Sequence, residues 1–162
     1  MSIKVLISDK LSQEGVDVLA NEKDIQVDIK TGLTHDELIE IIPEYDAILV
    51  RSGTKVKKEI IDAGTKLKII GRAGVGVDNV DVKHASSKGI FVVNAPEGNT
   101  ISTAEQSLAL MLALARKTPF AHASMQEEKW DNKSFQGAEL YDKTLGIIGL
   151  GRIGKEVAHR AK

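Results

Sequence analysis

Short apolar runs alternate with amphipathic segments along the first part of the chain. Five runs are typical of strands: 4–8, 25–29, 47–50, 67–70 and 90–93. Helical patterns fall between them, with Ser12 and Thr34 at N-cap positions and Glu37 spaced to complete a capping box with Thr34. Because alternating strands and helices form right-handed β-α-β units, we predict an α/β fold. Its first 95 residues should form a flavodoxin-like parallel sheet covered on both faces.

The loop at 94–99 interrupts this pattern with a proline and a glycine, which predicts a crossing between domains. After it, Ser102 and Glu105 have the spacing of a second capping box, followed by apolar residues at helical intervals. Residues 120–143 predict a further helix and an irregular arm that contains Trp130. We therefore expect one domain over residues 1–95 and a second over 96–162.

The end of the chain combines a strand, a glycine-rich turn and a helix. Residues 144–148 predict the strand, and the helix is expected from Lys155. Between them, residues 149–154 fit the pattern G-x-G-x-x-G, in the context that favours dinucleotide binding. A glycine-rich turn without a ligand is the alternative. The acidic residue that binds the ribose is expected about 20 residues further on, so the choice between NAD and NADP stays open.

Composition narrows the class of protein. The chain has 162 residues, 42% hydrophobic and 28% charged, which is typical of a soluble globular protein. Its formal net charge of -1 gives no electrostatic reason to expect nucleic acid or an anionic membrane as a partner.

The absence of cysteine excludes disulfides and thiolate chemistry, and we expect no metal site. With no signal peptide and no apolar run near the ~20 residues that cross a bilayer, we expect a cytoplasmic protein.

Three loops follow predicted strands at the edge where open α/β sheets bind ligands. They are residues 51–53, 72–76 and 94–99. Arg51 offers a charge suited to carboxylate or phosphate, and the successive N–H groups of 74–76 predict an anion-binding nest. The alternative is that these glycines serve turn geometry and that Arg72 is solvated.

Other polar residues are less informative. The histidines at 35, 84, 122 and 159 have no evident carboxylate partner, and we expect them to be surface or packing residues. Asp9 follows the first strand as in receiver domains, but Arg51 and Ser52 stand where such domains need a second aspartate. Trp130 fits local packing and a subunit interface equally well.

Taken together, four segments resemble the D-2-hydroxyacid dehydrogenase family, and most of all its members that oxidise D-3-phosphoglycerate with NAD on the route to L-serine. They are residues 50–56, 71–81, 94–99 and 144–154, in the family's order and spacing. The resemblance implies a substrate-binding domain, residues 1–95, followed by the beginning of a Rossmann NAD-binding domain, residues 96–162. It also implies a homodimer or a higher oligomer formed through the region 101–140.

The same resemblance implies roles for individual residues. Substrate contacts are expected at Arg51, Ser52, Gly53, Gly74, Val75, Gly76 and Asn99. Cofactor contacts are expected at Val75, Gly149, Gly151, Arg152, Ile153 and Gly154. The family's catalytic arginine, glutamate and histidine are expected beyond Lys162, so the chain alone should be inactive. A glyoxylate or hydroxypyruvate reductase, another D-2-hydroxyacid dehydrogenase, and a non-catalytic binding or dimerisation module remain alternatives.

Overall fold

The computed structural model describes residues 2–162. Contacts divide them into two compact units, the first ending at Gly98 and the second running from Asn99 to Lys162. The assignment of these units to substrate and cofactor stays a prediction.

The first unit is built on a parallel sheet. Its strands are β1 (Ile3–Ile7), β2 (Ile25–Ile29), β3 (Ala47–Val50), β4 (Ile69–Arg72) and β5 (Phe91–Asn94). All neighbouring pairs are parallel and the spatial order is β2-β1-β3-β4-β5. This is the flavodoxin-like order, so the predicted α/β fold class is confirmed.

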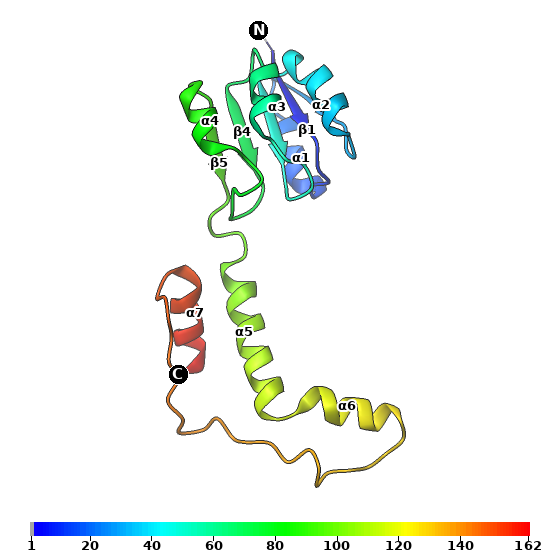
Figure 1. Ribbon diagram of the computed structural model, residues 1–162, viewed down its shortest axis with the longest axis vertical. Coiled ribbons are helices and arrows are strands. Elements are labelled where there is room, and N and C mark those ends of the chain that lie inside the picture. Colours follow the sequence, from blue (N-terminus) through cyan, green and yellow to red (C-terminus); the bar gives the residue numbers. More distant parts are fainter. Residues whose placement is uncertain (1) are drawn as a thin grey trace. The chain divides into compact units, whose positions relative to one another are not determined.

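Helices cover the sheet as right-handed crossovers require. They are α1 (Gln13–Ala20), α2 (His35–Ile41), α3 (Lys58–Ala63) and α4 (Val82–Ser87), with a short 3-10 turn at Ile42–Glu44. Helices α2, α3 and α4 lie on one face, and α1 lies on the other (Figure 1). The predicted caps are confirmed: Ser12 accepts from Gly15 N, and Thr34 forms a complete capping box with Glu37.

The core lies between the sheet and helices α2, α3 and α4. Leu6, Ile48 and Ile70 from adjacent strands are at most 1% exposed and pack with Ile60 of α3. The opposite face is less well covered, because α1 lies beside β2 at the other edge. There Ile69, Phe91 and Val93 are 42%, 71% and 52% exposed. The prediction that helices cover both faces is therefore wrong for β4 and β5 within the described residues.

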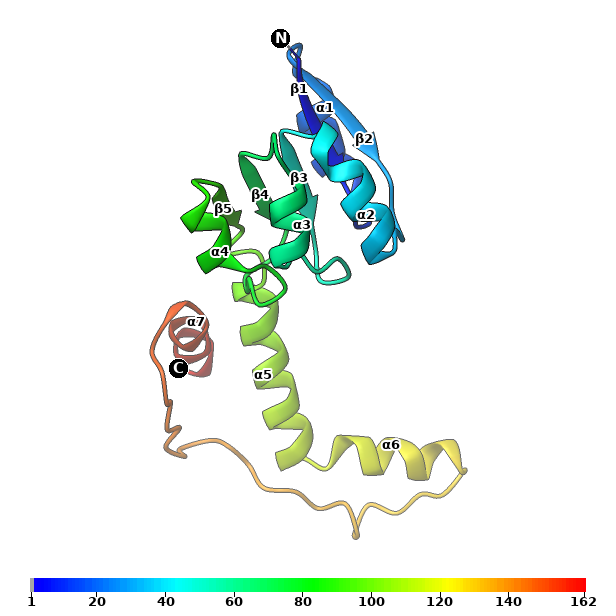
Figure 2. The same cartoon turned by 45° about the horizontal axis from the view of Figure 1, so that its top comes forward.

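The second unit contains three helices and a long arm. The helices are α5 (Thr100–Ala115), α6 (Thr118–Gln126) and α7 (Arg152–Ala161). Figure 2 shows α7 beside α5, with the arm between α6 and α7 running as extended chain. Among the described residues of this unit, Ala104 is the one apolar residue that is buried. No helix within residues 2–162 is both long and apolar enough to cross a membrane.

Three predictions for the second unit are wrong. Helix α5 begins at Thr100, because Thr103 N already donates to Asn99 O at 2.9 Å, so Ser102 lies inside the helix and cannot cap it. Glu105 instead approaches Arg160 of α7 at 3.7 Å. Residues 144–148 form no strand: within the described chain no strand pairs with them, and Ile148 is fully exposed. Helix α7 also begins at Arg152, before the predicted Lys155.

Candidate functional site

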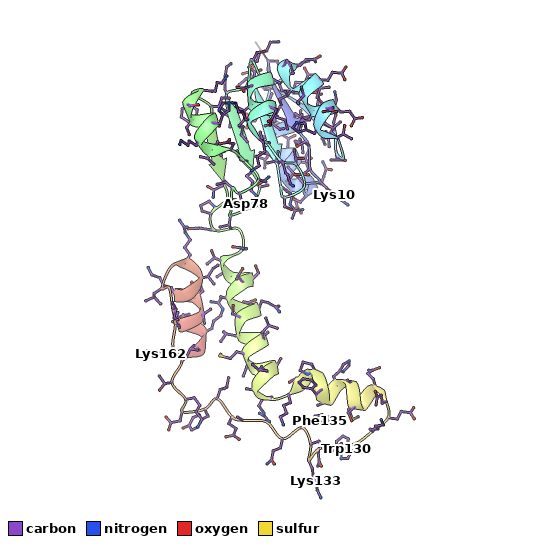
Figure 3. All side chains as sticks on the ribbon, viewed as in Figure 1. Lys10, Asp78, Trp130, Lys133, Phe135 and Lys162 are labelled. Carbon is purple, nitrogen blue, oxygen red and sulfur yellow. The ribbon has the colours of Figure 1, made fainter. Side chains whose placement is uncertain are left out.

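The carboxyl edge of the sheet carries a cavity between the ends of β1 and β3. The strand order reverses between these strands, and open α/β sheets bind ligands at such a switch point. The cavity has a volume of about 380 Å³. Its walls come from the loops after β1, β2 and β3 and from helices α2 and α3: Asp9, Gly32, Leu33, Thr34, His35, Leu38, Gly53, Thr54, Lys55 and Ile60. Lys10 and Asp78, labelled in Figure 3, mark the same edge.

The Arg51–Thr54 loop, which contains three of the predicted substrate residues, is fixed at both ends. Asp9 Oδ2 accepts hydrogen bonds from Arg51 N at 2.6 Å and from Thr54 N at 3.0 Å. Asn79 Nδ2 donates to Arg51 O at 2.6 Å and to Thr54 O at 2.7 Å. The Arg51 side chain is exposed, and its Nη1 donates to Lys10 O at 3.3 Å. The loop therefore presents a guanidinium from a well-defined backbone.

The loop after β4 lies beside it. Ala73 N donates to Val50 O at 2.8 Å, which attaches this loop to the end of β3. Gly74 N donates to Arg72 O at 2.8 Å, so this N–H group is not available to an anion. The predicted anion-binding nest is therefore reduced to the N–H groups of Val75 and Gly76. On its other side, Asn94 Nδ2 donates to Val75 O at 2.7 Å.

The Arg72 side chain lies against Gly74. A Cβ at Gly74 would lie 1.9 Å from Arg72 Nη1, and Arg72 Nε is buried without a protein partner among the described residues. A buried guanidinium nitrogen without an acceptor is costly, because burial removes its water.

The glycine motif has the geometry that a dinucleotide turn requires. Gly149 has φ +93°, a left-handed conformation that favours glycine. A Cβ on Gly154 would lie 2.2 Å from Gly149 O, so the third glycine allows the helix to pack on the turn. Gly151 caps α7 and has open space around its Cα, which leaves room for a ligand to approach the backbone. The residues present therefore fit a pyrophosphate at the start of α7.

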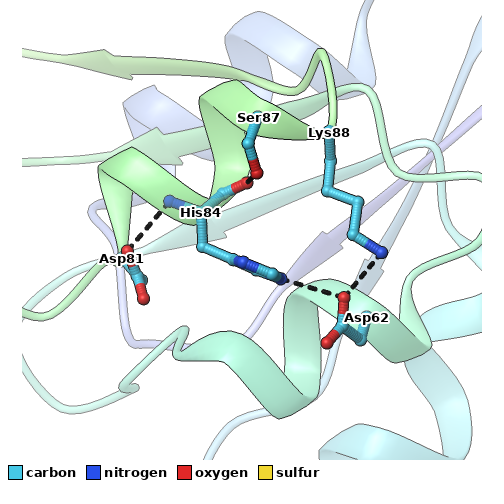
Figure 4. A network of polar contacts seen from close by, with 5 residues as sticks. All are labelled: Asp62, Asp81, His84, Ser87 and Lys88. Atoms are coloured by element: carbon cyan, nitrogen blue, oxygen red, sulfur yellow. Dashed lines mark hydrogen bonds and ion pairs between the residues drawn. The ribbon is translucent and has the colours of Figure 1, made fainter.

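One histidine does have a carboxylate partner, contrary to the sequence prediction. His84 Nε2 lies 2.9 Å from Asp62 Oδ1, and Lys88 Nζ lies 2.7 Å from the same oxygen (Figure 4). Lys88 and then His84 lower the pKa of the Asp62 carboxyl from 3.8 to about 2. The cluster joins α3 to α4, and its residues do not line the cavity described above.

The structure thus brings together some of the predicted residues. Arg51, Ser52 and Gly53 lie on one loop and Gly74–Gly76 on its neighbour, whereas Asn99 and the glycine motif belong to the second unit. Sequence reasoning did not assign a role to Asp9 or Asn79 in this site. The one available signal was their position directly after β1 and after the β4 loop, at the ligand-binding edge.

Comparisons with known proteins give a consistent result. Residues 5–146 match the family model of the D-isomer specific 2-hydroxyacid dehydrogenase catalytic domain. A D-3-phosphoglycerate dehydrogenase of Synechocystis sp. is 59% identical over 98% of the chain and 28% of its own length. A hydroxypyruvate reductase of Thermotoga maritima is 49% identical over 98% of the chain and 51% of its own length.

A solved structure agrees with these sequences. The chain resembles the NAD+-bound 3-phosphoglycerate dehydrogenase of Entamoeba histolytica with a TM-score of 0.77 and 32% identity, covering 99% of the chain and 51% of that structure. The chain thus spans between about a quarter and about half of the length of these three relatives.

Proposed function

Because the chain belongs to the D-isomer specific 2-hydroxyacid dehydrogenase family, we propose that it is part of an NAD-dependent enzyme that oxidises D-3-phosphoglycerate to 3-phosphohydroxypyruvate. The observation that carries this proposal is the 59% identity to a D-3-phosphoglycerate dehydrogenase over almost the whole chain. The exposed Arg51 at the carboxyl edge supports it, since a guanidinium suits a phosphoryl group.

In this proposal the first unit binds the phosphorylated hydroxyacid. Arg51 pairs with the phosphoryl group, and the neighbouring backbone of Ser52 and Gly53 donates to the ligand. Val75 and Gly76 donate from the adjacent loop, since no backbone acceptor pairs with their N–H groups among the described residues. Asn99, the residue before α5, remains among the proposed substrate contacts.

The second unit binds NAD through the turn at residues 149–154. The positive φ of Gly149 and the open space at Gly151 favour a pyrophosphate at the N-terminus of α7, where the helix dipole is positive. Arg152 and Ile153 belong to the first turn of that helix. Bound NAD would accept a hydride from the substrate's C2, while the proton of the C2 hydroxyl would go to a base of the catalytic set.

The 162-residue chain by itself should be inactive. The family's catalytic arginine, glutamate and histidine have no counterparts among the residues assigned above, and we place them in sequence that follows Lys162. Further parts of the proposal are a cytoplasmic location and a place in L-serine biosynthesis.

A homodimer is also part of the proposal. Apolar side chains of α5, α6 and the arm are open to solvent: Leu110, Leu114, Phe120 and Trp130 are between 60% and 80% exposed. An apolar surface of this kind favours association, and aromatic residues are enriched at interfaces. The exposure of Trp130 favours an interface over local packing.

A hydroxypyruvate reductase is the second candidate. The relative from Thermotoga maritima favours it, because its identity to the chain is 49% and the chain spans 51% of its length. A reductase of this kind needs no phosphoryl-binding group.

Steady-state kinetics of the full-length protein separates the two. We expect kcat/KM for 3-phosphohydroxypyruvate to exceed that for hydroxypyruvate and glyoxylate by at least about tenfold, which corresponds to roughly 1.4 kcal/mol of transition-state discrimination. Equal or reversed values would support the reductase. Binding of NADH without turnover of any hydroxyacid or ketoacid would support the non-catalytic module.

A further inference from the structure

The Arg51–Thr54 loop is held by the same two residues from opposite sides. Both terminal N–H groups of the loop donate to one carboxylate, and both terminal C=O groups accept from one amide. We infer that Asp9 and Asn79 are positioning residues that hold this loop in its ligand-binding conformation. The inference rests on the proposed function in one respect, namely that the loop binds the substrate.

Asp9 acts through a single oxygen atom. Its Oδ2 accepts from Arg51 N at 2.6 Å and from Thr54 N at 3.0 Å, although the residues are more than forty positions apart in sequence. Hydrogen bonds to a charged acceptor are stronger than neutral ones. The carboxylate thus fixes the distance between the two ends of the loop.

Asn79 holds the carbonyl groups of the same loop, and we call Asp9 and Asn79 together the clamp. The residue is 7% exposed, and its Nδ2 donates at 2.6 Å to Arg51 O and at 2.7 Å to Thr54 O. Because both neighbours are carbonyl oxygens, only the NH2 group can face them. Asn79 Oδ1 is buried with no partner in the described chain. The side chain therefore keeps this orientation at the cost of an unsatisfied acceptor, which indicates that the two donated bonds are the important ones.

The clamp also connects the two predicted substrate loops. Val56 N donates to Asn79 O at 2.9 Å, and Val56 and Val80 form a parallel bridge directly after the loop. On the β1 side, Ser8 Oγ donates to Thr54 Oγ1 at 3.1 Å. Residues 51–54 and the segment after the β4 loop are thus joined by direct hydrogen bonds.

The groups left unpaired are those that face outward. Within residues 2–162 no acceptor pairs with the backbone N–H of Ser52 or Gly53, and both residues are exposed. With the N–H and C=O groups of Arg51 and Thr54 already satisfied, these two N–H groups and the Arg51 side chain are what the loop offers to an anion. A loop that sampled other conformations would bind the same ligand less tightly, in proportion to the lost population.

Matched variants of the full-length protein test the inference. Asp9→Asn keeps one carbonyl oxygen that can accept both bonds, whereas Asp9→Ala removes the acceptor, and Asn79→Asp keeps the shape but removes both donors. We expect Asp9→Ala and Asn79→Asp to raise KM for the hydroxyacid by about tenfold and to leave KM for NAD unchanged. Asp9→Asn should restore most of the wild-type KM. As a control, Ile61→Ala in the core should lower Tm without changing KM.

Amide hydrogen exchange gives a readout that is independent of activity. In the Asp9→Ala protein the N–H groups of Arg51 and Thr54 should exchange on the order of tenfold faster, and in Asp9→Asn they should remain protected. Unchanged exchange and unchanged KM in both Asp9→Ala and Asn79→Asp would overturn the inference. A wild-type protein that turns over no hydroxyacid would overturn the proposed function, while the exchange rates would still decide whether the clamp exists.

Discussion

The carboxylate of Asp9 occupies the space that a side chain at position 53 would need. A Cβ on Gly53 would lie 2.6 Å from Asp9 Oδ1, and Asp9 cannot move away without losing its bonds to Arg51 and Thr54. We therefore expect Gly53→Ala to displace Asp9 and loosen the loop. In the full-length protein, KM for the hydroxyacid should rise by about tenfold, measured by steady-state kinetics.

A second glycine of the same unit provides the control. A Cβ on Gly15 of α1 would make an ordinary 3.5 Å contact with Ser12 Oγ. Because alanine favours a helix, Gly15→Ala should stabilise the first unit by roughly 0.5–1 kcal/mol and leave KM unchanged. If Gly53→Ala had the same KM for the hydroxyacid as Gly15→Ala, a Cβ at position 53 would not displace Asp9, and the prediction would be wrong.

The glycines of the 149–154 turn should respond differently to alanine. At Gly154 a Cβ would lie 2.2 Å from a backbone oxygen, so Gly154→Ala should lower both Tm and NADH affinity. At Gly151 a Cβ would meet nothing within 4 Å, so Gly151→Ala should keep the wild-type Tm. Its NADH affinity should still fall, because a bound pyrophosphate needs that space.

Thermal melts and NADH titrations of the full-length variants measure both effects. The control is Gly146→Ala, at a position before the turn where a Cβ would also meet nothing within 4 Å. This substitution should change neither Tm nor NADH affinity. If Gly151→Ala bound NADH as tightly as the wild type, the proposed position of the pyrophosphate would be wrong.

The Asp62 cluster predicts a pH dependence of stability. Because Lys88 and His84 lower the folded-state pKa of Asp62 from 3.8 to about 2, its stabilising contribution is present above pH 3.8 and is lost as the pH falls toward 2. The stability difference between wild type and Asp62→Asn should therefore shrink across this window. Other carboxyl groups titrate in both proteins and cancel in the difference.

Lys88 should be the larger cause of that lowered pKa. We expect Lys88→Met to raise the pKa of Asp62 toward its ordinary value, as measured by NMR titration of the carboxyl carbon. The exposed Lys83 on the same helix provides the matched control, and Lys83→Met should leave the Asp62 pKa near 2. An equal effect of both substitutions would point to general charge rather than to the 2.7 Å contact.

The exposed face of α5 should form the dimer contact. Leu114 is 77% exposed, and a glutamate there would have to be desolvated in an interface. We predict that Leu114→Glu shifts the full-length protein from dimer to monomer in sedimentation experiments. His159→Glu, an exposed position on α7, should leave the dimer intact. A Leu114→Glu protein that sediments as the wild-type dimer would place the interface elsewhere.

Local signals in the sequence predicted the fold well. The capping box of Thr34 and Glu37 forms within four residues, where Glu37 Oε2 accepts from Thr34 N at 2.8 Å, so sequence spacing alone was enough. The same spacing at Ser102 and Glu105 failed, because the chain enters the helical conformation at Thr100 and leaves Ser102 no role as a cap.

Features that depend on distant residues were harder to predict. A strand needs hydrogen-bonding neighbours, so the apolar pattern of residues 144–148 does not produce one in the described chain. The clamp joins Asp9 and Asn79 to the Arg51–Thr54 loop across 25 or more positions, and only the sheet topology brings them together. The position of the Arg51–Thr54 loop at the carboxyl edge could be predicted from the sequence, but the residues that hold this loop could not.

The most direct test of the account concerns Arg51 and the phosphoryl group. The ratio of kcat/KM for 3-phosphohydroxypyruvate to that for hydroxypyruvate should be measured for the full-length wild type and for Arg51→Gln. If Arg51 pairs with the phosphoryl group, the substitution should reduce this ratio by about tenfold or more, with little change for hydroxypyruvate. An unchanged ratio would mean that the carboxyl edge of the first unit does not bind the phosphoryl group through Arg51, and the account would be contradicted.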